Sequence, residues 1–154
     1  MEYRAFIDQQ ITQLREQVGD KIAINALSGG VDSSVVTALA HRALGSQLKT
    51  IFVDNAIMRE GEPQRVVGAF AGLGIPVELI DARREFLKAL KGLTDPEDKR
   101  NAITHTFYKD VFGKAVRRFK ATFLLHGTIL TDIPGVNRCL YDLTPKPPAT
   151  VEYV

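Results

Sequence analysis

One short stretch constrains the fold of this chain more than any other: residues 26–34, which read Ala-Leu-Ser-Gly-Gly-Val-Asp-Ser-Ser. It follows a short apolar run at 22–27 and leads into apolar residues with helical spacing from about Ser33. A strand, a loop of small residues and a helix start can hold phosphate, because the first amides of the helix and its dipole attract an anion. Gly29 and Gly30 lack a Cβ atom, so the loop can turn sharply and approach an anion closely.

The polar side chains of this loop also bear on whether it binds phosphate. Ser28, Ser33 and Ser34 offer hydroxyl donors, whereas the Asp32 carboxylate would repel phosphate. A Mg²⁺ ion between the carboxylate and the phosphate oxygens would remove that repulsion. The alternative is a simple helix-entry turn capped by Ser or Asp. The strand and helix that flank the loop favour the phosphate site over this alternative.

Length and composition indicate one soluble domain and exclude several kinds of site. The chain has 154 residues, 45% of them hydrophobic and 25% charged, which is ordinary for a globular protein. A net charge of +2 is too small to imply nucleic-acid binding. Cys139 is the only cysteine, which excludes an internal disulfide, a Cys-x-x-Cys site and a cysteine-held iron–sulfur cluster. Without a membrane-length apolar run or a signal-peptide pattern, we expect a cytoplasmic enzyme.

The apolar periodicity predicts alternating helices and strands. Helices are expected at 2–18, from near Ser33 to Leu44, at 62–73, at 84–90 and from 94 to about 119, and strands at 22–27, 49–54, 75–80 and 121–125. The first helix should bury Tyr3, Phe6, Ile7, Ile11, Leu14 and Val18, and the second should bury Val35 together with Val36, Leu39, Ala40, Ala43 and Leu44. Two later segments, 139–143 and 149–154, are strand-like but have no partner that the sequence identifies.

This alternation predicts an α/β fold, a doubly wound parallel sheet with helices on both faces. Ligands of such sheets bind at the carboxyl ends of the strands, where the strand order reverses. Both the 28–34 loop and Asp54-Asn55 follow strand ends, so the predicted site lies where this fold places ligands.

The loop and several later segments resemble one enzyme family. The loop lacks the Gly-Lys-Ser/Thr ending of a Walker A loop and the G-x-G-x-x-G pattern of dinucleotide sites. It resembles the SGGxDS signature of the PP-loop ATP pyrophosphatases, which cleave ATP between its α- and β-phosphates. Other segments resemble the GMP synthases of this group: 52–55 with Arg59, Gly61 and Glu62, the mobile lid at 87–92 and 94–100, the GTIYPD motif at 127–129 with Asp132, and the tail at 136–138, 141–144 and 146–153.

The resemblance implies that ATP adenylates the C2 oxygen of XMP with release of pyrophosphate, and that ammonia then displaces AMP to give GMP. It implies that ATP and pyrophosphate are bound by Ser28, Gly29, Gly30, Val31, Asp32, Ser33, Ser34, Val53, Asp54, Gly127 and Thr128. It assigns catalysis to Asp32, Lys99 and Arg100, XMP binding to Arg59, Lys146 and Glu152, and Mg²⁺ to Asp32 and Asp132. Simpler interpretations are a solvated helix face for Lys99 and Arg100, a surface pair for Arg59 and Glu62, a turn cap for Asp132, and a packing or polar role for His126.

The chain also departs from the family pattern. Only residues 133–135 separate Asp132 from the tail-like segment, where the family has its dimerisation and XMP-binding domain. We therefore expect an ATP pyrophosphatase domain at 1–132 and a remnant of the C-terminal segment at 133–154. Ala56 and Thr104 stand where the family has Gly, and His126 where it has Gln.

The sequence also indicates possible partners and leaves alternative functions open. A glutaminase needs a nucleophilic Cys with His partners, and Cys139 lies in the tail, so ammonia is expected to be free or to come from a glutamine amidotransferase partner. A homodimer is a further expectation, with 141–143 or 151–153 adding to a sheet edge. The alternatives are another PP-loop ligase, such as a tRNA thiolase or an NAD synthetase, and a non-catalytic or regulatory ATP-binding remnant. The single cysteine argues against a thiolase.

Overall fold

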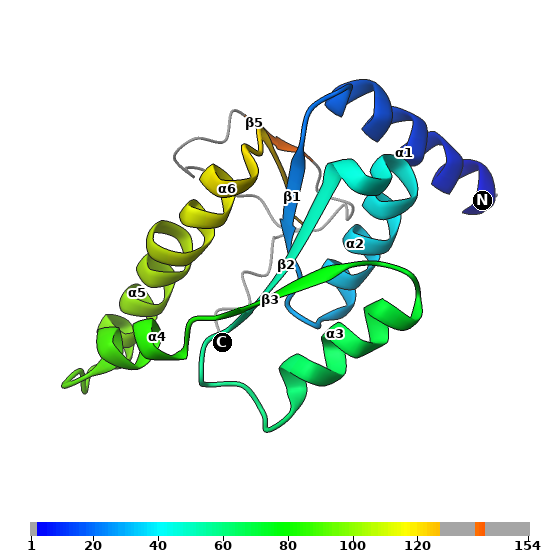
Figure 1. Cartoon of the computed structure of the whole chain (residues 1–154). Helices are drawn as coiled ribbons and strands as arrows, with labels where there is room; N and C mark the ends of the chain where they lie inside the picture. The colour runs from blue at the N-terminus through cyan, green and yellow to red at the C-terminus, as the bar shows by residue number, and fades with distance from the viewer. Residues whose placement is uncertain (1–2, 127–137, 141–154) are drawn as a thin grey trace.

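A five-stranded parallel sheet organises the molecule. The computed structural model describes residues 3–126 and 138–140, and its strands lie in the order β3-β2-β1-β4-β5 (Figure 1). The strands are β1 (Ala23–Ala26), β2 (Leu48–Asp54), β3 (Val77–Asp81), β4 (Phe123–Leu125) and β5 (Arg138–Leu140). The helices are α1 (Tyr3–Val18), α2 (Val31–Leu44), α3 (Glu62–Gly72), α4 (Arg83–Leu90), α5 (Pro96–His105) and α6 (Gly113–Phe119), with a 3-10 turn η1 (Gly45–Gln47) and a π-helical segment η2 (Thr106–Phe112).

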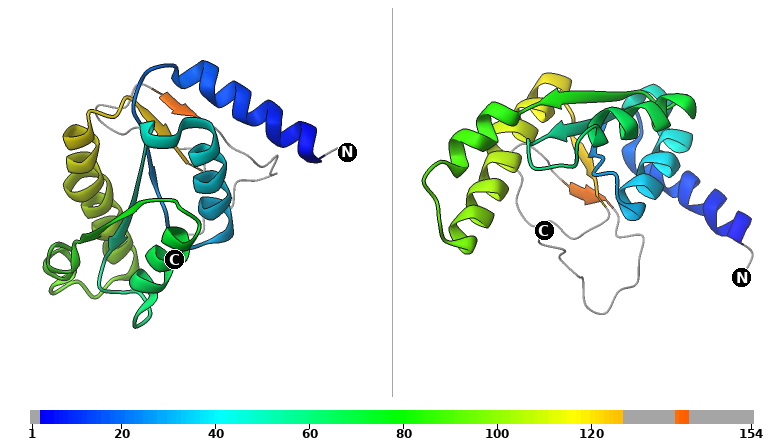
Figure 2. Two further views of the ribbon diagram at one scale, coloured as in Figure 1. Left: turned by 45° about the vertical axis from the view of Figure 1, so that its right-hand side comes forward. Right: turned by 90° about the horizontal axis from the view of Figure 1, so that it is seen from below.

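Helices cover the sheet on both faces, as the two views of Figure 2 show. On one face, α1 and α2 pack Ile11, Leu14, Val36 and Ala40 against the sheet, and Phe70 of α3 extends this layer. On the other face, Phe86 of α4 and residues 111–116 of η2 and α6 pack against β1, β2 and β4. Apolar surface buried on both sides is the main stabilising term of a parallel sheet. The predicted doubly wound α/β fold is confirmed.

The strand order reverses at β1. From β1 the chain moves to β2 and then β3 on one side, and it later returns to β4 on the other side. The pairing register sets Ala26 of β1 opposite Ile51 of β2, and Asn25 opposite Leu125 of β4. The crevice at the carboxyl ends of β1 and β4 is therefore the switch point at which such sheets bind ligands.

The helix predicted from 94 to about 119 is three consecutive segments. Between α5 and α6 the backbone widens to a π-helix, in which the Gly113 amide donates to the carbonyl of Tyr108. A Cβ atom at Gly113 would lie 3.0 Å from that carbonyl oxygen, which is tighter than nine in ten real Cβ contacts. Because glycine has no Cβ atom, residue 113 can take part in the wider π-helical turn. Hydrophobic periodicity alone does not predict such a turn. Insertions of this kind occur often at functional sites.

Three predicted core residues are exposed. Tyr3 is 74% and Phe6 42% exposed, because α1 buries only its second half, through Gln10, Ile11, Leu14 and Val18. Val35 is 51% exposed because the buried side of α2 runs through Val36, and neighbouring positions on a helix differ by about 100°.

The predicted strand at 139–143 has a partner inside the chain. Residues 138–140 form β5, which pairs in parallel with β4 and sets Cys139 opposite Leu124. The sequence did not identify this partner because strand pairing depends on tertiary contacts. The proposed edge strands at 141–143 and 151–153 lie outside the described residues. Within the described ranges, no helix is long and apolar enough to cross a membrane.

The fully buried ring of Phe86 should be a main source of stability. We expect Phe86→Ala to lower the free energy of unfolding by about 3–5 kcal/mol, because it removes a buried ring and leaves a cavity. The neighbouring Leu87 is 57% exposed, so Leu87→Ala should change the stability by less than about 0.5 kcal/mol. Urea unfolding of both variants checks this, and equal losses would contradict the packing of α4.

Candidate functional site

The loop between β1 and α2 turns sharply at Gly29. The Leu27 amide donates to the carbonyl of Ile51 at 2.8 Å, which holds the start of the loop beside β2. Gly29 has a φ of 83°, a conformation that L side chains rarely adopt. A Cβ atom there would also lie 3.1 Å from Cγ2 of Val66 on α3. Both the backbone conformation and the close approach of α3 therefore require glycine.

The serine hydroxyls of this loop bond to the loop itself. Ser33 Oγ lies 2.8 Å from Ser28 Oγ, accepts from the Ser28 amide and donates to the carbonyl of Gly30. Ser34 Oγ donates to the same carbonyl at 2.7 Å. These side chains therefore define the loop's shape. Gly30 is the N-cap of α2 and provides no side-chain cap, so the first amides of α2 are the natural donors for an anion.

Asp32 lies in the exposed first turn of α2. Mg²⁺ commonly binds one or two protein carboxylates together with phosphate oxygens, so one aspartate here fits a metal that arrives with a nucleotide. Among residues 3–126 and 138–140, no group of three His, Cys, Asp or Glu side chains forms a preassembled metal site. The second predicted ligand, Asp132, lies outside these ranges.

A charged cluster lies at the carboxyl ends of β2 and β3. The mostly buried Asp54 accepts from the Ala56 amide through Oδ1, and its Oδ2 is 3.8 Å from Nε of Arg83. Arg83 also forms a two-point ion pair with Asp81, with Nε–Oδ1 at 2.9 Å and Nη2–Oδ2 at 2.5 Å. Val53 is buried in the core, which leaves its backbone as the group that a nucleotide could meet. The sequence reasoning missed Asp81 and Arg83, whose only signal is their position after a strand.

The hydrogen bonds from Arg83 hold the pKa of the Asp81 carboxyl at about 2, below its ordinary value of 3.8. The same bonds to Asp81, followed by the charges of Asp81 and Asp54, raise the pKa of Arg83.

The segment after β2 is shaped by its backbone. Ala56 has a φ of 66°, in the left-handed region that favours glycine. Glu62 accepts from the Arg59 amide, and the Glu62 amide donates to the Arg59 carbonyl. The predicted pair of Arg59 and Glu62 therefore exists as a hydrogen-bonded turn before α3 rather than as an ion pair between side chains. The guanidinium of Arg59 takes no part in these two bonds.

The predicted lid residues lie on α5, in the layer opposite α2. Asp95 caps this helix by accepting from the amides of Glu97 and Asp98. Arg100 donates to Glu97 at 2.8 Å, and both side chains are largely exposed. A ligand that contacts the 28–34 loop and also Lys99 or Arg100 would have to span the carboxyl edge of the sheet between the two helical layers.

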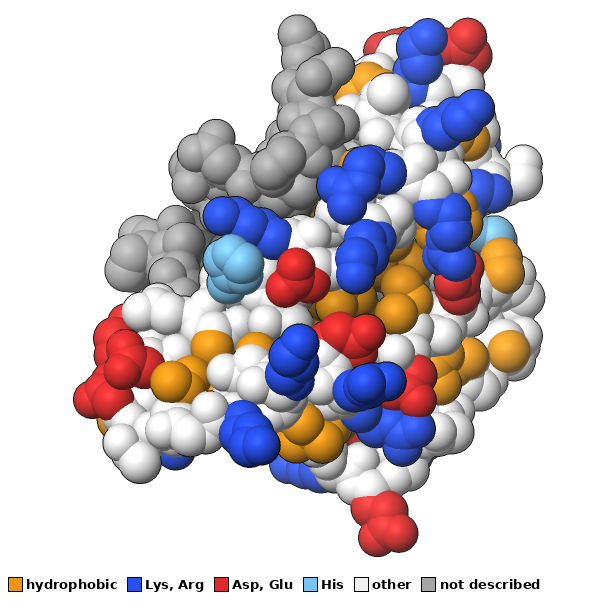
Figure 3. Space-filling model, turned by 60° about the vertical axis from the view of Figure 1, so that its left-hand side comes forward, with side chains coloured by type: hydrophobic (Ala, Val, Ile, Leu, Met, Phe, Trp, Pro, Cys, Tyr) orange, Lys and Arg blue, Asp and Glu red, His pale blue; other side chains and the backbone are white. Residues whose placement is uncertain are grey.

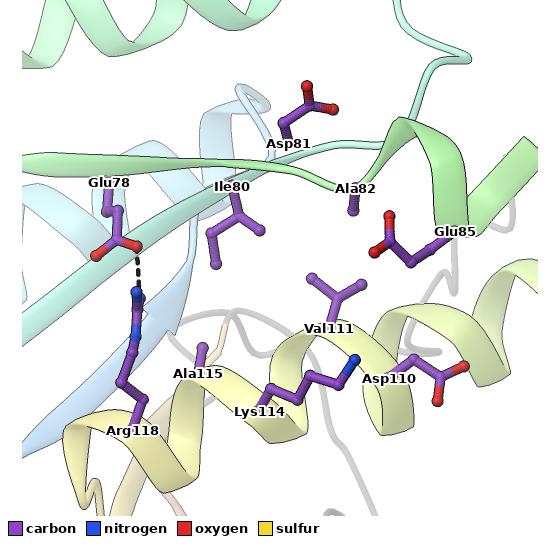
Figure 4. Close-up of a pocket in the computed structure, with 10 residues that line it drawn as sticks. All are labelled: Glu78, Ile80, Asp81, Ala82, Glu85, Asp110, Val111, Lys114, Ala115 and Arg118. Atoms are coloured by element: carbon purple, nitrogen blue, oxygen red, sulfur yellow. Dashed lines mark hydrogen bonds and ion pairs between the residues drawn. The ribbon is translucent and has the colours of Figure 1, made fainter.

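A separate cavity of about 260 Å³ lies between the edge strand β3 and η2–α6 (Figure 4). Its floor is apolar, and its rim carries Glu85, Asp110 and Lys114 together with the ion pair of Glu78 and Arg118. Figure 3 shows basic and acidic side chains intermixed over this side of the molecule. No residue of the 28–34 loop lines this cavity, so it is not the predicted phosphate site.

Five predicted site residues lie outside the described residues: Gly127, Thr128, Asp132, Lys146 and Glu152. His126 ends the described segment after β4, at the carboxyl edge of the sheet.

Comparison with known proteins identifies the family. The model of the family described as asparagine synthase matches residues 15–127, which include the loop, all of α2–α6 and four strands. The chain belongs to the asparagine synthase family. This family comprises PP-loop ATP pyrophosphatases, so the sequence-based assignment to that group is confirmed.

Relatives of this asparagine synthase family member include GMP synthases. The chain is 48% identical over 133 residues to one of the subunits of the glutamine-hydrolysing GMP synthase of Archaeoglobus fulgidus, and the match covers 86% of this chain and 43% of that relative. The chain thus spans less than half the length of this curated relative. The expected resemblance to GMP synthases is confirmed.

Solved structures confirm the fold. The NH3-dependent NAD synthetase of Campylobacter jejuni has a TM-score of 0.67 at 16% identity, over 81% of this chain and 56% of that one. The glutamine-dependent NAD+ synthetase of Acinetobacter baumannii, solved with ADP, has a TM-score of 0.59 at 15% identity, over 77% of this chain and 24% of that one.

A side chain at Gly29 should deform the loop. We expect Gly29→Ala to weaken the binding of Mg²⁺-ATP at least tenfold, because alanine is strained at this φ and its Cβ meets Val66. Gly19→Ala is the matched control, since it also has a positive φ but nothing within 4 Å of its Cβ. Isothermal titration calorimetry on both variants measures the affinity. Equal ATP affinities in the two would contradict the role of the loop.

Asp81 should titrate with a midpoint near pH 2 in the folded protein. Because its pKa is depressed, the stability that the ion pair contributes is present above about pH 3.8 and is lost as the pH falls toward 2. Arg83→Gln should raise the midpoint toward 3.8, although the backbone amide of residue 83 still donates to Asp81. The carboxyl carbon shift of Asp81, followed by NMR, checks both values, and an unchanged midpoint in the variant would refute the assignment to Arg83.

Proposed function

We propose that this chain is the ATP pyrophosphatase part of a GMP-synthase-type ligase. The observation that carries the proposal is the 28–34 loop, whose bend at Gly29 and side-chain-free cap at Gly30 leave the first amides of α2 for an anion. Its position at the switch point of the sheet, and the 48% identity to part of a GMP synthase, support the same conclusion. Family membership supports ATP as the nucleotide.

The proposed reaction has two displacements. The C2 oxygen of XMP attacks the α-phosphorus of ATP, and the bond between the α- and β-phosphates breaks to release pyrophosphate. Ammonia then attacks C2, and AMP leaves with the oxygen to give GMP. No protein nucleophile is needed, because positioning and electrostatic stabilisation can carry such transfers.

The residues of the chain take distinct roles in this proposal. The 28–34 loop holds the leaving pyrophosphate through the amides at 31–33, with Gly127 and Thr128 beside it. The end of β2, at Val53 and Asp54, meets the adenosine. Lys99 and Arg100 close over the phosphates from α5, and Arg59, Lys146 and Glu152 bind XMP. Asp32 and Asp132 would hold Mg²⁺, which would offset negative charge on the leaving oxygens.

We further propose the setting of the reaction. Ammonia is supplied free or by a separate glutamine amidotransferase, since the Archaeoglobus relative is named as one subunit of a glutamine-hydrolysing enzyme. The chain consists of an ATP pyrophosphatase domain at 1–132 and a C-terminal remnant at 133–154. It acts in the cytoplasm, as part of purine biosynthesis, and forms a homodimer.

A second candidate is a ligase of the NAD synthetase type. The fold likeness to an NH3-dependent NAD synthetase favours it, because that enzyme shares the sheet and helices described above. A chain that binds ATP without turnover is the third possibility. The acceptor that triggers pyrophosphate release distinguishes these three functions.

The decisive measurement is pyrophosphate release from Mg²⁺-ATP with XMP, with the deamidated precursor of NAD, or with no acceptor, each with and without ammonium. We expect release that requires XMP, and GMP formation that also requires ammonium. Asp32→Asn should lower XMP-dependent release by about 100-fold or more, because it weakens charge stabilisation worth several kcal/mol. Asp20→Asn, a substitution at an exposed turn, is the matched control. Release with the NAD precursor alone, or tight ATP binding without release, would overturn the assignment.

A further inference from the structure

A buried polar pair lies beneath the phosphate loop. Asn25 on β1 is 1% exposed and Thr37 on α2 is fully buried. Asn25 Nδ2 donates to Thr37 Oγ1 at 2.7 Å, and Thr37 Oγ1 donates to the carbonyl of Ser33 at 2.7 Å. Strand β1 is otherwise apolar, so Asn25 is its one polar residue.

The geometry fixes the direction of this chain of hydrogen bonds. A threonine hydroxyl has one proton, and the Ser33 carbonyl can only accept, so Thr37 must give its proton to Ser33. Asn25 must then present its NH2 group to Thr37. The Oδ1 atom of Asn25 is left buried and without a hydrogen-bond partner in the part of the chain that the structure describes. An unpaired buried acceptor destabilises a fold, so an apolar pair would suit stability better here.

The chain of bonds ends on the residue that shapes the loop. Ser33 connects through its own hydroxyl to Ser28 and to the carbonyl of Gly30. A helical hydroxyl that bonds to the carbonyl four residues earlier also bends the helix slightly. Thr37 therefore sets the direction of the first turn of α2, and Asn25 fixes Thr37 to the central strand.

We propose that Asn25 and Thr37 are positioning residues for pyrophosphate binding. They hold Ser33 and the first turn of α2 so that the amides at 31–33 converge on one anion, and stability at the loop is given up for this alignment. The inference rests on the proposed function, since it takes the loop to be the pyrophosphate site. Neither residue touches the ligand.

The test compares affinity for two ligands in matched variants. We expect Thr37→Val to weaken binding of inorganic pyrophosphate with Mg²⁺ at least tenfold, and to change the affinity for AMP less than twofold. Thr37→Ser keeps the hydroxyl and should bind pyrophosphate within threefold of the unmodified protein. Thr106→Val is the control, because Thr106 is buried in η2 on the opposite face of the sheet.

The double variant Asn25→Leu with Thr37→Val separates alignment from folding. It replaces both partners with apolar groups, so we expect an equal or higher Tm together with the same loss of pyrophosphate affinity. Calorimetry and thermal unfolding give both quantities. Unchanged pyrophosphate affinity in the double variant, or equal losses for pyrophosphate and AMP, would overturn the positioning role. Absence of pyrophosphate and ATP binding in the unmodified protein would instead overturn the proposed function and this inference with it.

Discussion

The parallel pairing of β1 with β2 on one side and β4 on the other is the constraint on which the rest of the structure depends. Because β1 is central, its residues are buried under both helical layers, and its carboxyl end opens at the point where strand order reverses. The loop that follows β1 is held to β2 by the bond from Leu27 to Ile51. A loop that follows an edge strand would have a neighbouring strand on one side only.

The loop divides its polar groups between two tasks. The hydroxyls of Ser28, Ser33 and Ser34 bond within the loop and determine its shape, while the amides at the start of α2 are left for a ligand. The buried bonds from Asn25 through Thr37 to Ser33 continue this arrangement into the core. Rigidity of this kind reduces the entropy lost when a charged ligand is held in one orientation.

The two helical layers contribute differently to the site. The α1–α3 layer carries the loop and the residues that support it, whereas the α4–α6 layer carries the predicted lid and Arg83, which pairs with Asp81 at the end of β3. The two layers meet at the carboxyl ends of β2 and β3, where Arg83 approaches Asp54. A nucleotide lying along this edge would contact both layers, which fits the proposed reaction, in which two substrates must be aligned. Two of the three proposed XMP-binding residues, Lys146 and Glu152, lie outside the described residues.

The sequence by itself determined the fold class, the position of the 28–34 loop after a central strand, and the family. It could do so because the SGGxDS loop, the apolar strands and the helical periodicity are all local signals that depend on neighbouring residues. Tertiary structure alone decided the pairing of β5 with β4, the exposure of Val35 and the ion pair of Asp81 with Arg83. It also decided the π-helical segment before Gly113 and the buried bond of Asn25, a polar residue in an apolar strand whose partner Thr37 lies on another element. These features arise from contacts between segments that are distant in the sequence, or from the exact register of a helix, and periodicity carries no information about either.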